Sequence, residues 1–396
     1  MTPPNRDLFL ETADRIGARI CRDAIWSGRE CNWIARQYDD SYQALPPLLY
    51  GGTSGIAWFL LHLFAATKER VFRITAEGAL SQALTRSGSR VESPGFHAGA
   101  SGIAYAAAWA ARIAVRDDYA EHSRRLLRAA NPLPERIDVV DGSAGAIPAL
   151  LFADREYPGQ GFLDQAVRHG EFLLGAARRG ETGWSWRTTA MHEAHLTGFA
   201  HGAAGIGWAL LELFRATGEA TFREAGLQAF AYEQSLFDAE EQNWPDLRSG
   251  LGDRGRNSRR CMSAWCHGAP GIGLARLRAF EILQDDSCRA QAETAIRTTN
   301  RSLAALDNYS LCHGASGNAE LLLCAAAALK NPACADPAYR IAEAGIERFE
   351  QQRAPWPCGY PGEGETPTLM IGTSGIGYFL LRLYDPVRFP SILLPI

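Results

Sequence analysis

A Gly-x-x-Gly pattern recurs seven times along the 396-residue chain, and each copy is followed by an apolar run rich in alanine. The second glycines of the seven copies lie 43 to 66 residues apart, at Gly55, Gly102, Gly145, Gly205, Gly271, Gly317 and Gly375. Spacing of this size marks a repeated supersecondary unit rather than a duplicated domain. No other feature of the chain constrains its fold as strongly.

Each repeat predicts two helices. The run after the glycines, as in 205–214, is apolar nearly all round, which is typical of a buried helix. Segments between the runs, such as 162–179 and 221–237, carry apolar residues every three or four positions and indicate amphipathic outer helices. Strand-like alternation is almost absent.

Seven units that each need a neighbour, with no evident polar end caps, are expected to close into a ring. We therefore predict an all-α protein, an α/α toroid or double barrel of seven inner and seven outer helices. We expect one domain over 1–396, with a helical lead-in over 1–45 and the repeats between 50 and 384.

Composition excludes several classes of function. The formal net charge of −4 gives no reason to expect nucleic acid or an anionic membrane surface as a partner. The amino terminus lacks a signal-peptide pattern, and no stretch has the ~20 apolar residues of a membrane span. Nine scattered cysteines argue against a disulfide framework. These features predict a cytoplasmic protein whose cysteines are thiols.

The repeat also brings distant side chains together. The glycines should open the inner helices, so all seven turns meet at one end of the barrel. Cys266 and Cys312 occupy the same position in consecutive repeats, two residues before the first glycine, and a ring places them side by side. With His313 they make a soft three-ligand set for one Zn²⁺ per chain, with a fourth coordination position open to substrate.

Two other interpretations of these turns stay open. The "CHG" tripeptides could simply precede helices, although their shared register in adjacent repeats favours metal binding. His267 could supply a fourth ligand and close the site, which would give a structural rather than a reactive metal centre.

The repeats and the motifs around the two cysteines resemble those of a known family. The seven repeats, "WCHG" at 265–268 and "CHG" at 312–314 are similar to the lanthionine synthetase C-like (LanC-like) cyclases, zinc proteins with a double ring of helices. "NWPDLR" at 243–248 and the segment 372–395 look like the cyclase portion of class II lanthipeptide synthetases. No counterpart of their dehydratase half is evident, so a separate dehydratase is an expected partner.

The resemblance implies a site and a reaction. Zinc would be held by Cys266, Cys312 and His313. His201 and Asp138 match the family's "AHG" histidine and its aspartate, and Asp138 is preferred to the neighbouring Asp141. Some free-standing members carry an arginine four residues before the first zinc cysteine; this chain has Met262 there, with Arg259 and Arg260 nearby, so that role is unassigned.

The implied reaction joins a cysteine of a dehydrated precursor peptide to a dehydroalanine or dehydrobutyrine, giving a lanthionine or methyllanthionine thioether. Zinc would hold the substrate thiolate, His201 would act as general acid, and Asp138 would orient it. His201 could instead be a core histidine and Asp138 a cap. His97 should pack or cap, while His192 and His195 should lie on a loop at the mouth.

Three rival functions remain. A toroidal glycosidase would need two opposed carboxylates, whereas Asp138 and Asp141 are near neighbours. A LanC-like protein that binds a thiol such as glutathione, or a non-catalytic scaffold for a separate dehydratase, would keep the same residues.

Overall fold

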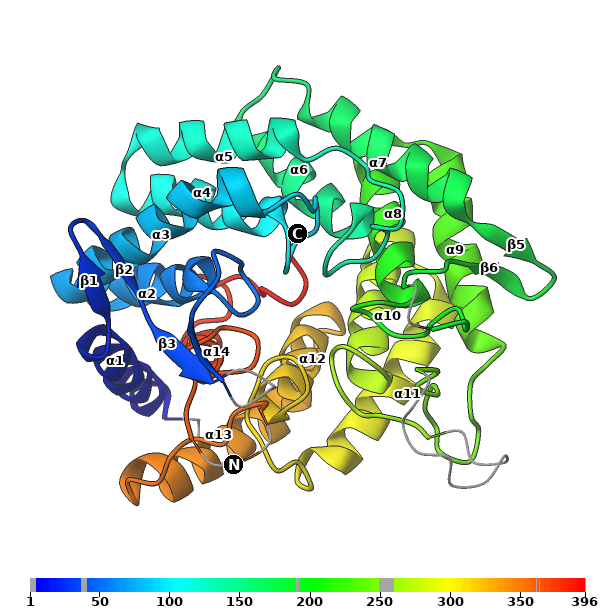
Figure 1. Cartoon of the computed structure of the whole chain (residues 1–396). Helices are drawn as coiled ribbons and strands as arrows, with labels where there is room; N and C mark the ends of the chain where they lie inside the picture. Colours follow the sequence, from blue (N-terminus) through cyan, green and yellow to red (C-terminus); the bar gives the residue numbers. More distant parts are fainter. Residues whose placement is uncertain are drawn as a thin grey trace.

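The computed structural model describes residues 5–36, 41–189, 192–248, 260–360, 362 and 364–395. Over these residues seven inner helices alternate with seven outer ones (Figure 1). The inner helices are α2 (Thr53–Thr67), α4 (Ala100–Ala114), α6 (Ser143–Glu156), α8 (Ala203–Thr217), α10 (Ala269–Leu283), α12 (Ala315–Ala328) and α14 (Thr373–Tyr384). The outer helices are α1 (Arg6–Arg22), α3 (Arg70–Arg90), α5 (Asp117–Ala129), α7 (Phe162–Ala176), α9 (Ala220–Gln234), α11 (Asp286–Leu303) and α13 (Asp336–Gly345).

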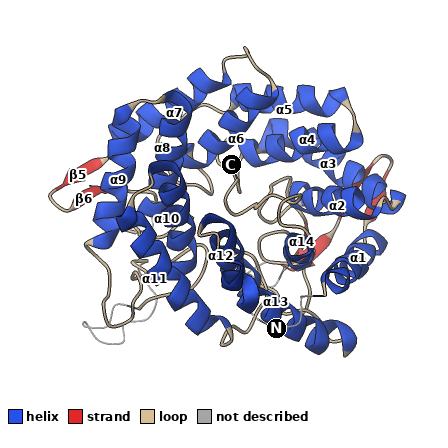
Figure 2. Ribbon diagram, turned by 180° about the vertical axis from the view of Figure 1, so that it is seen from behind, coloured by secondary structure: helices blue, strands red, loops and turns tan. Residues whose placement is uncertain are grey.

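The inner helices form a closed ring. Each packs against both of its inner neighbours, and α14 completes the circle against α2. The inner helices α2 to α12 each also pack against the outer helix that follows them in the chain, whereas α14 pairs with α1. Views from opposite sides show the same ring (Figures 1 and 2). The predicted α/α toroid is confirmed.

The second glycine of each repeat is required by a close backbone approach. A Cβ atom on any of the seven would lie 1.7 to 2.2 Å from the carbonyl oxygen of the residue six positions earlier. Every turn therefore folds back onto the first turn of its own inner helix, and only glycine leaves room for that carbonyl. The first glycines are the N-caps of the same helices.

Backbone hydrogen bonds then join the seven turns to one another. Around the ring, each turn donates an N–H to a carbonyl of the next, at 2.8 to 3.3 Å. The carbonyl acceptors, in order, are those of His97, Val140, Ala200, Cys266, Cys312, Met370 and Tyr50. These residues occupy the same position in the seven sequence repeats, so the repeat alignment fixed which side chains are neighbours at the mouth.

The lead-in over 1–45 is only partly helical, which corrects the prediction. After α1, two antiparallel hairpins pair β1 (Ile25–Ser27) with β2 (Glu30–Asn32) and β3 (Ile34–Arg36) with β4 (Tyr42–Ala44). The first hairpin turns through Gly28, whose φ of 61° suits a tight two-residue loop. Three-residue strands are too short to show alternation in sequence. A third hairpin joins β5 (Arg178–Gly180) to β6 (Gly183–Ser185).

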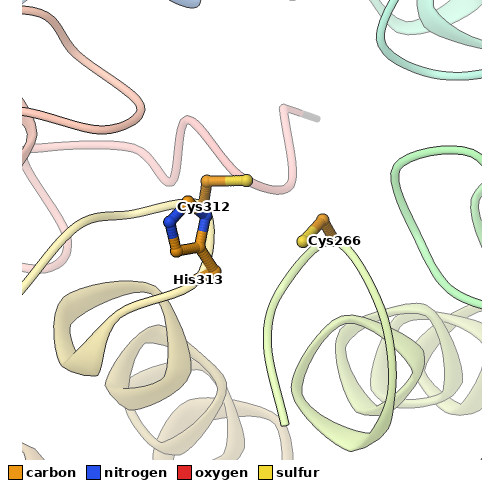
Figure 3. A group of neighbouring side chains, drawn as sticks. All are labelled: Cys266, Cys312 and His313. Carbon is orange, nitrogen blue, oxygen red and sulfur yellow. The ribbon is translucent and has the colours of Figure 1, made fainter. Parts of the chain in front are cut away.

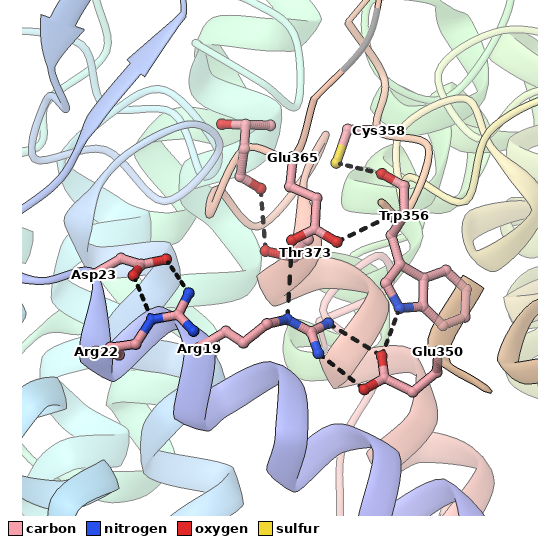
Figure 4. Close-up of polar contacts among 9 residues, drawn as sticks. Arg19, Arg22, Asp23, Glu350, Trp356, Cys358, Glu365 and Thr373 are labelled. Carbon is pink, nitrogen blue, oxygen red and sulfur yellow. Dashed lines mark hydrogen bonds and ion pairs between the residues drawn. The ribbon is translucent and has the colours of Figure 1, made fainter. Parts of the chain in front are cut away.

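Helix α1 is fastened to the region that precedes α14. The Arg19 guanidinium donates two hydrogen bonds to the Glu350 carboxylate, at 2.9 and 3.1 Å, and lies 4.0 Å from Glu365 (Figure 4). Glu350 belongs to a π-helical turn, η2 (Ile346–Gln351), that extends α13, and it also accepts from the Trp356 indole at 3.1 Å. A short 3₁₀ helix, η1 (Pro332–Ala335), precedes α13.

The last described residues run into the middle of the ring, where Figure 1 places the C-terminus. Ile392, Leu393 and Leu394 are buried, and the Trp265 indole donates to the Leu393 carbonyl at 3.2 Å. This segment therefore supports the turn that carries Cys266. None of the described helices is both long and apolar enough to cross a membrane.

Candidate metal centre and its histidine–aspartate pair

Two adjacent turns at the mouth bring together two thiols and an imidazole. Cys266 lies before α10, and Cys312 and His313 lie before α12; the three side chains point toward a common space (Figure 3). One ligand atom from each lies within 4.8 Å of the other two. Both cysteines are buried, at 7% and 5% exposure. The three residues predicted as metal ligands are thus brought together by the fold.

The protonation chemistry of this cluster fits a divalent cation. A hydrogen bond from Cys266 to the Cys312 sulfur raises the pKa of Cys266 well above its ordinary value and lowers the pKa of Cys312. The Tyr50 hydroxyl also donates to the Cys312 sulfur. Two thiolates this close would repel each other, and a positive charge between them offsets that repulsion. A soft metal ion such as Zn²⁺ supplies that charge.

The His313 ring is fixed in the tautomer that a metal needs. Its Nε2 lies 2.8 Å from the Gly359 carbonyl oxygen, which can only accept a hydrogen bond. The proton therefore sits on Nε2, and the lone pair of Nδ1 is left for a metal ion. Sequence reasoning missed the carbonyl of Gly359, because a backbone acceptor leaves no residue-type signal.

His201 and Asp138 form a second unit beside the cluster. The Asp138 carboxylate accepts from His201 Nδ1 at 2.6 Å and from the Asp141 backbone N–H at 2.8 Å. Burial alone lowers the pKa of His201, but the hydrogen bond and negative charge of Asp138 outweigh it, so the pKa is raised above 6.5. Asp141 turns away to pair with Arg136. The carboxylate that engages the histidine is therefore Asp138.

Two cavities meet at His201. One, of about 270 Å³, is lined by Cys266, Cys312, His201 and Tyr50, together with Trp265 and Tyr360. The other, of about 770 Å³, is lined by Asp138, Asp141 and His201 and carries the acidic side chains of Glu92 and Glu135. The bond to Asp138 uses His201 Nδ1, so Nε2 is the nitrogen available for proton transfer at this junction.

His267 does not join the metal cluster. Among the described residues, only Cys266, Cys312 and His313 form a group with metal-ligand spacing. His267 is 1% exposed, and its Nδ1 lies 4.0 Å from Asp246 Oδ1. Burial, together with the charge of Arg248, lowers the pKa of His267 to about 4, so its ring is neutral. The interpretation of His267 as a fourth ligand is therefore not supported.

The arginines considered near Met262 fall elsewhere. Arg259 lies outside the described residues. Arg260 is exposed, and its backbone carbonyl accepts from the Asp246 N–H at 2.9 Å. Arg248, which sequence reasoning did not single out, reaches the Met262 sulfur at 3.5 Å. The signal for it was present in "NWPDLR", where Asp246 and Arg248 are two residues apart.

The remaining histidines at the mouth have structural surroundings. His97 is fully buried and packs edge-on against Trp265, as the sequence predicted. His195 contacts the Ser185 hydroxyl at 2.7 Å, and its backbone carbonyl accepts from the Tyr232 hydroxyl at 2.6 Å. His195 thus anchors its loop to α9. His192 lies on the same loop.

The fold and site together define a class: α/α toroids that gather two cysteines and a histidine at the mouth of the barrel. The particular family follows from comparison with known proteins. The family model described as "Lanthionine synthetase C-like protein" matches residues 43–394. The chain belongs to this family, as the sequence resemblance indicated.

Two relatives of the chain are biosynthesis proteins of Lactococcus lactis subsp. lactis. The nisin biosynthesis protein NisC of Lactococcus lactis subsp. lactis is 27% identical over 206 residues, which are 48% of this chain and 49% of NisC. The lacticin 481/lactococcin biosynthesis protein LcnDR2 of the same organism is 26% identical over 50% of this chain and 22% of LcnDR2. The chain thus matches about half the length of NisC and less than a quarter of LcnDR2.

A third relative and two solved structures are also similar to this chain. "Glutathione S-transferase LANCL1" of Danio rerio is 24% identical over 364 residues, or 86% of this chain and 82% of that protein. Among solved structures, nisin cyclase superposes with a TM-score of 0.72 at 18% identity and 97% coverage of both chains. A GH76 α-mannanase of Bacteroides thetaiotaomicron superposes with a TM-score of 0.56 at 11% identity, covering 97% of this chain and 96% of that one. The toroid is thus shared with glycosidases, and the site must decide the function.

Proposed function

We propose that this protein is a zinc-dependent lanthipeptide cyclase. The observation that carries the proposal is the placement of Cys266, Cys312 and His201 on the wall of one cavity, with His201 bonded to Asp138. This arrangement puts a site for a thiolate next to a proton donor. A thioether-forming addition to a dehydroamino acid needs these two elements.

Cys266, Cys312 and His313 would hold the zinc ion. When bound, zinc would lower the pKa of a substrate cysteine thiol and keep it as a nucleophilic thiolate near neutral pH. Three protein ligands are typical of catalytic zinc sites, whereas structural sites use four. The Gly359 carbonyl accepts a hydrogen bond from His313 and the Tyr50 hydroxyl donates one to Cys312, and both contacts would stabilise the ligand set.

His201 and Asp138 would manage the protons. As the sulfur–carbon bond forms at the β-carbon of the dehydroamino acid, the π electrons move toward the α-carbon and its carbonyl, giving an enolate. His201 Nε2–H then donates a proton to the α-carbon, which completes the thioether. The Asp138 carboxylate accepts a hydrogen bond from His201 Nδ1–H and favours the imidazolium form of the ring. In that form Nε2 also carries a proton, which is available for transfer.

A second candidate function is thiol chemistry on a small molecule such as glutathione. Its specific support is the Danio rerio relative named glutathione S-transferase LANCL1, which aligns with most of this chain. The same cavity would hold the thiolate in either case. The two candidates differ in the second reactant: a cyclase requires the dehydroamino acid on the same peptide as the cysteine.

The proposal implies partners and a compartment. The substrate would be a dehydrated precursor peptide, prepared by a separate dehydratase. If this protein served only as a scaffold for that dehydratase, it would catalyse no reaction itself. All nine cysteines are free thiols in the structure. A reducing, cytoplasmic setting would keep both the ligand cysteines and the substrate cysteines in that form.

The proposal is tested by zinc content and cyclisation measured on the same preparations. The substrate is a synthetic peptide with one cysteine and one dehydroalanine, and ring formation is followed by the loss of its free thiol. We expect one zinc per chain and ring closure by the native protein. Cys312→Ala should lose the zinc and reduce cyclisation to the uncatalysed background, because a catalytic zinc site loses one of its three protein ligands.

Cys288→Ala is the matched control, since Cys288 is equally buried but lies in α11. It should keep both zinc and activity. Zinc retained in Cys312→Ala would contradict the metal site. Zinc present without ring closure, but with addition of glutathione to a dehydroalanine peptide, would favour the second candidate function. Zinc without either reaction would favour the scaffold.

A further inference from the structure

Two buried hydroxyls in the wall of the smaller cavity have no role in the mechanism above. Thr366 and Thr368 line the cavity of about 270 Å³ that is also lined by Cys266, Cys312 and His201. The two threonines are 5% and 2% exposed, and neither hydroxyl has a hydrogen-bond partner among the described residues. A buried hydroxyl without a partner costs free energy, so two of them in one cavity wall point to a ligand that would pair with them.

The position of these hydroxyls distinguishes them from other unpaired ones. Ser54 and Thr299 are also buried without a partner, but they lie inside the helices α2 and α11 and line neither cavity at the mouth. Of all the buried side-chain polar atoms that lack a partner in the described part of the chain, only those of Thr366 and Thr368 belong to residues that line these two cavities.

The chain around the threonines presents them on one side. Glu365 is exposed and Thr366 is buried, and Thr368 is buried again after the half-buried Pro367, an alternation that is typical of an extended segment. The Glu365 carboxylate points the other way, where it accepts from the Trp356 backbone N–H at 2.9 Å (Figure 4). The two threonines therefore share the face toward the cavity, with a spacing of roughly 6.6 Å along an extended chain.

This segment is held rigidly by the first turn of α14. The Thr366 carbonyl accepts from the Thr373 backbone N–H at 2.8 Å and from the Thr373 hydroxyl at 3.2 Å. The Pro367 carbonyl accepts from the Ser374 hydroxyl. The main chain that carries the two unpaired hydroxyls is therefore fixed before any ligand binds, which lowers the entropy cost of binding.

The threonines and His201 flank the metal cluster on opposite sides. The Met370 carbonyl, two residues after Thr368, accepts from the Cys312 backbone N–H at 2.8 Å, so this turn is the ring neighbour of Cys312. The turn of His201 is instead the ring neighbour of Cys266. A substrate whose sulfur lies at the cluster can thus extend toward the threonines on one side and toward His201 on the other.

We propose that Thr366 and Thr368 are specificity-determining residues that bind the main chain of the substrate peptide beside its reacting cysteine. The inference rests on the proposed cyclase function and deepens it, because it assigns the cysteine side of the peptide to this wall and the dehydroamino acid to the side of His201.

The chemistry of a hydroxyl suits this role. A hydroxyl both donates and accepts, so it can pair with either the N–H or the C=O of a peptide group. The spacing of roughly 6.6 Å equals that of alternate residues in an extended peptide, whose main-chain groups point the same way. Rotation about the Cα–Cβ bond exchanges a threonine hydroxyl with its methyl group, so each hydroxyl can turn to a peptide in the cavity.

A binding experiment tests the threonines without relying on turnover. The probe is the capped peptide acetyl-Gly-Gly-Cys-Gly-Gly-amide, which offers main chain on both sides of one thiol. Its counterpart is 2-mercaptoethanol, a thiol without peptide groups. Both are titrated by calorimetry into zinc-loaded protein, and zinc is measured again afterwards. We expect the native protein to bind the peptide about tenfold or more tightly than 2-mercaptoethanol, as two neutral hydrogen bonds would produce.

The variants remove the hydroxyls and keep the shape of the side chains. The double variant Thr366→Val/Thr368→Val should lose about tenfold in peptide affinity and keep its zinc and its affinity for 2-mercaptoethanol. Its free energy of unfolding should be unchanged or higher, because the hydroxyls have no partner in the unliganded protein. Thr299→Val, which removes an equally buried and unpaired hydroxyl in α11, should match the native protein in both affinities.

Three results would overturn the assignment. The first is a native protein that binds the peptide no more tightly than 2-mercaptoethanol. The second is a double variant with native affinity for the peptide. The third is a double variant that loses zinc or its affinity for 2-mercaptoethanol, which would give the threonines a structural role.

Failure of the proposed function has a different signature. The native protein would prefer the peptide and the double variant would lose that preference, but the dehydroalanine peptide would not be cyclised. A native protein that holds no zinc and binds neither thiol would contradict both the proposed function and the role of the threonines.

Discussion

His97 and His201 lie on turns of the same construction, yet their chemistry is opposite. Both turns end in a glycine N-cap that opens an inner helix, α4 or α8. His97 is fully buried, and burial lowers its pKa to about 3. His201 is half-buried and has its pKa raised above 6.5 despite the opposing effect of burial. The repeated turn supplies a place for a side chain but not its protonation state.

The difference comes from one carboxylate. Neither nitrogen of His97 has a hydrogen-bond partner within the described part of the chain, and its neighbours are the rings of Trp265 and Phe96. His201 is bonded to Asp138, which belongs to the loop before α6. The backbone ring sets where each residue lies, and a single charged neighbour from an adjacent repeat decides whether a histidine can carry a proton at neutral pH.

The largest effect is expected when His201 is replaced by a residue that cannot transfer a proton. A replacement of His97 is the comparison. His201→Asn should reduce cyclisation by about 10²- to 10⁴-fold, the usual contribution of a general acid, while zinc content stays at the native value. His97→Phe should leave activity within about twofold. It removes two buried, unpaired nitrogens, so the free energy of unfolding should be unchanged or higher. Single-turnover rates and denaturant unfolding measure the two quantities.

Two results with these variants would contradict the contrast drawn between His97 and His201. Equal loss of activity in both would mean that the mouth responds to packing rather than to the proton carried by His201. Loss of zinc in His201→Asn would mean that its role is to support the cluster.

A second test concerns the turns themselves, and one glycine differs from its counterparts. Gly268, the N-cap of α10, has a φ of 91°, whereas the six other caps are extended. A Cβ there would lie 1.7 Å from the Met262 carbonyl oxygen. Gly268→Ala should therefore lower the free energy of unfolding by about 2–5 kcal/mol, through backbone strain and overpacking.

Gly51→Ala is the matched control, because a Cβ at Gly51 meets no atom within 4 Å. Its effect on the unfolding free energy should stay within about 0.5 kcal/mol. Similar losses in both variants would show that the mouth turns are sensitive to any added side chain. The claim that the backbone at Gly268, beside Cys266, specifically requires glycine would then be wrong.

Much of the fold could be predicted from the sequence because the same Gly-x-x-Gly pattern occurs seven times. Seven glycine pairs gave the ring, and their register identified Cys266 and Cys312 as neighbours. The hairpins over 25–44 escaped prediction because strands of three residues carry too little pattern. The contact of the Tyr50 hydroxyl with the Cys312 sulfur escaped prediction because it depends on where a single side chain points, and no periodicity encodes that direction.

The smallest expected effect tests the cause of the contrast directly, and its signature is a change with pH. Asp138→Asn keeps the shape of the side chain but removes the charge that raises the pKa of His201, so burial should then bring that pKa below 6.5. If protonated His201 is the acid, the alkaline decline of kcat/KM should begin at lower pH in the variant.

The loss should therefore be largest at alkaline pH, where a lower pKa leaves less of His201 protonated, and it should narrow at acidic pH, where His201 is protonated in both proteins. The same raised pKa stabilises the native fold at pH values below that of the unfolded histidine, and this contribution disappears as pH rises through the folded pKa. Asp138→Asn should thus also flatten the dependence of unfolding free energy on pH in that window. Parallel pH–rate profiles for native and variant protein would assign Asp138 to orientation alone, and the charge would not be what separates His201 from His97.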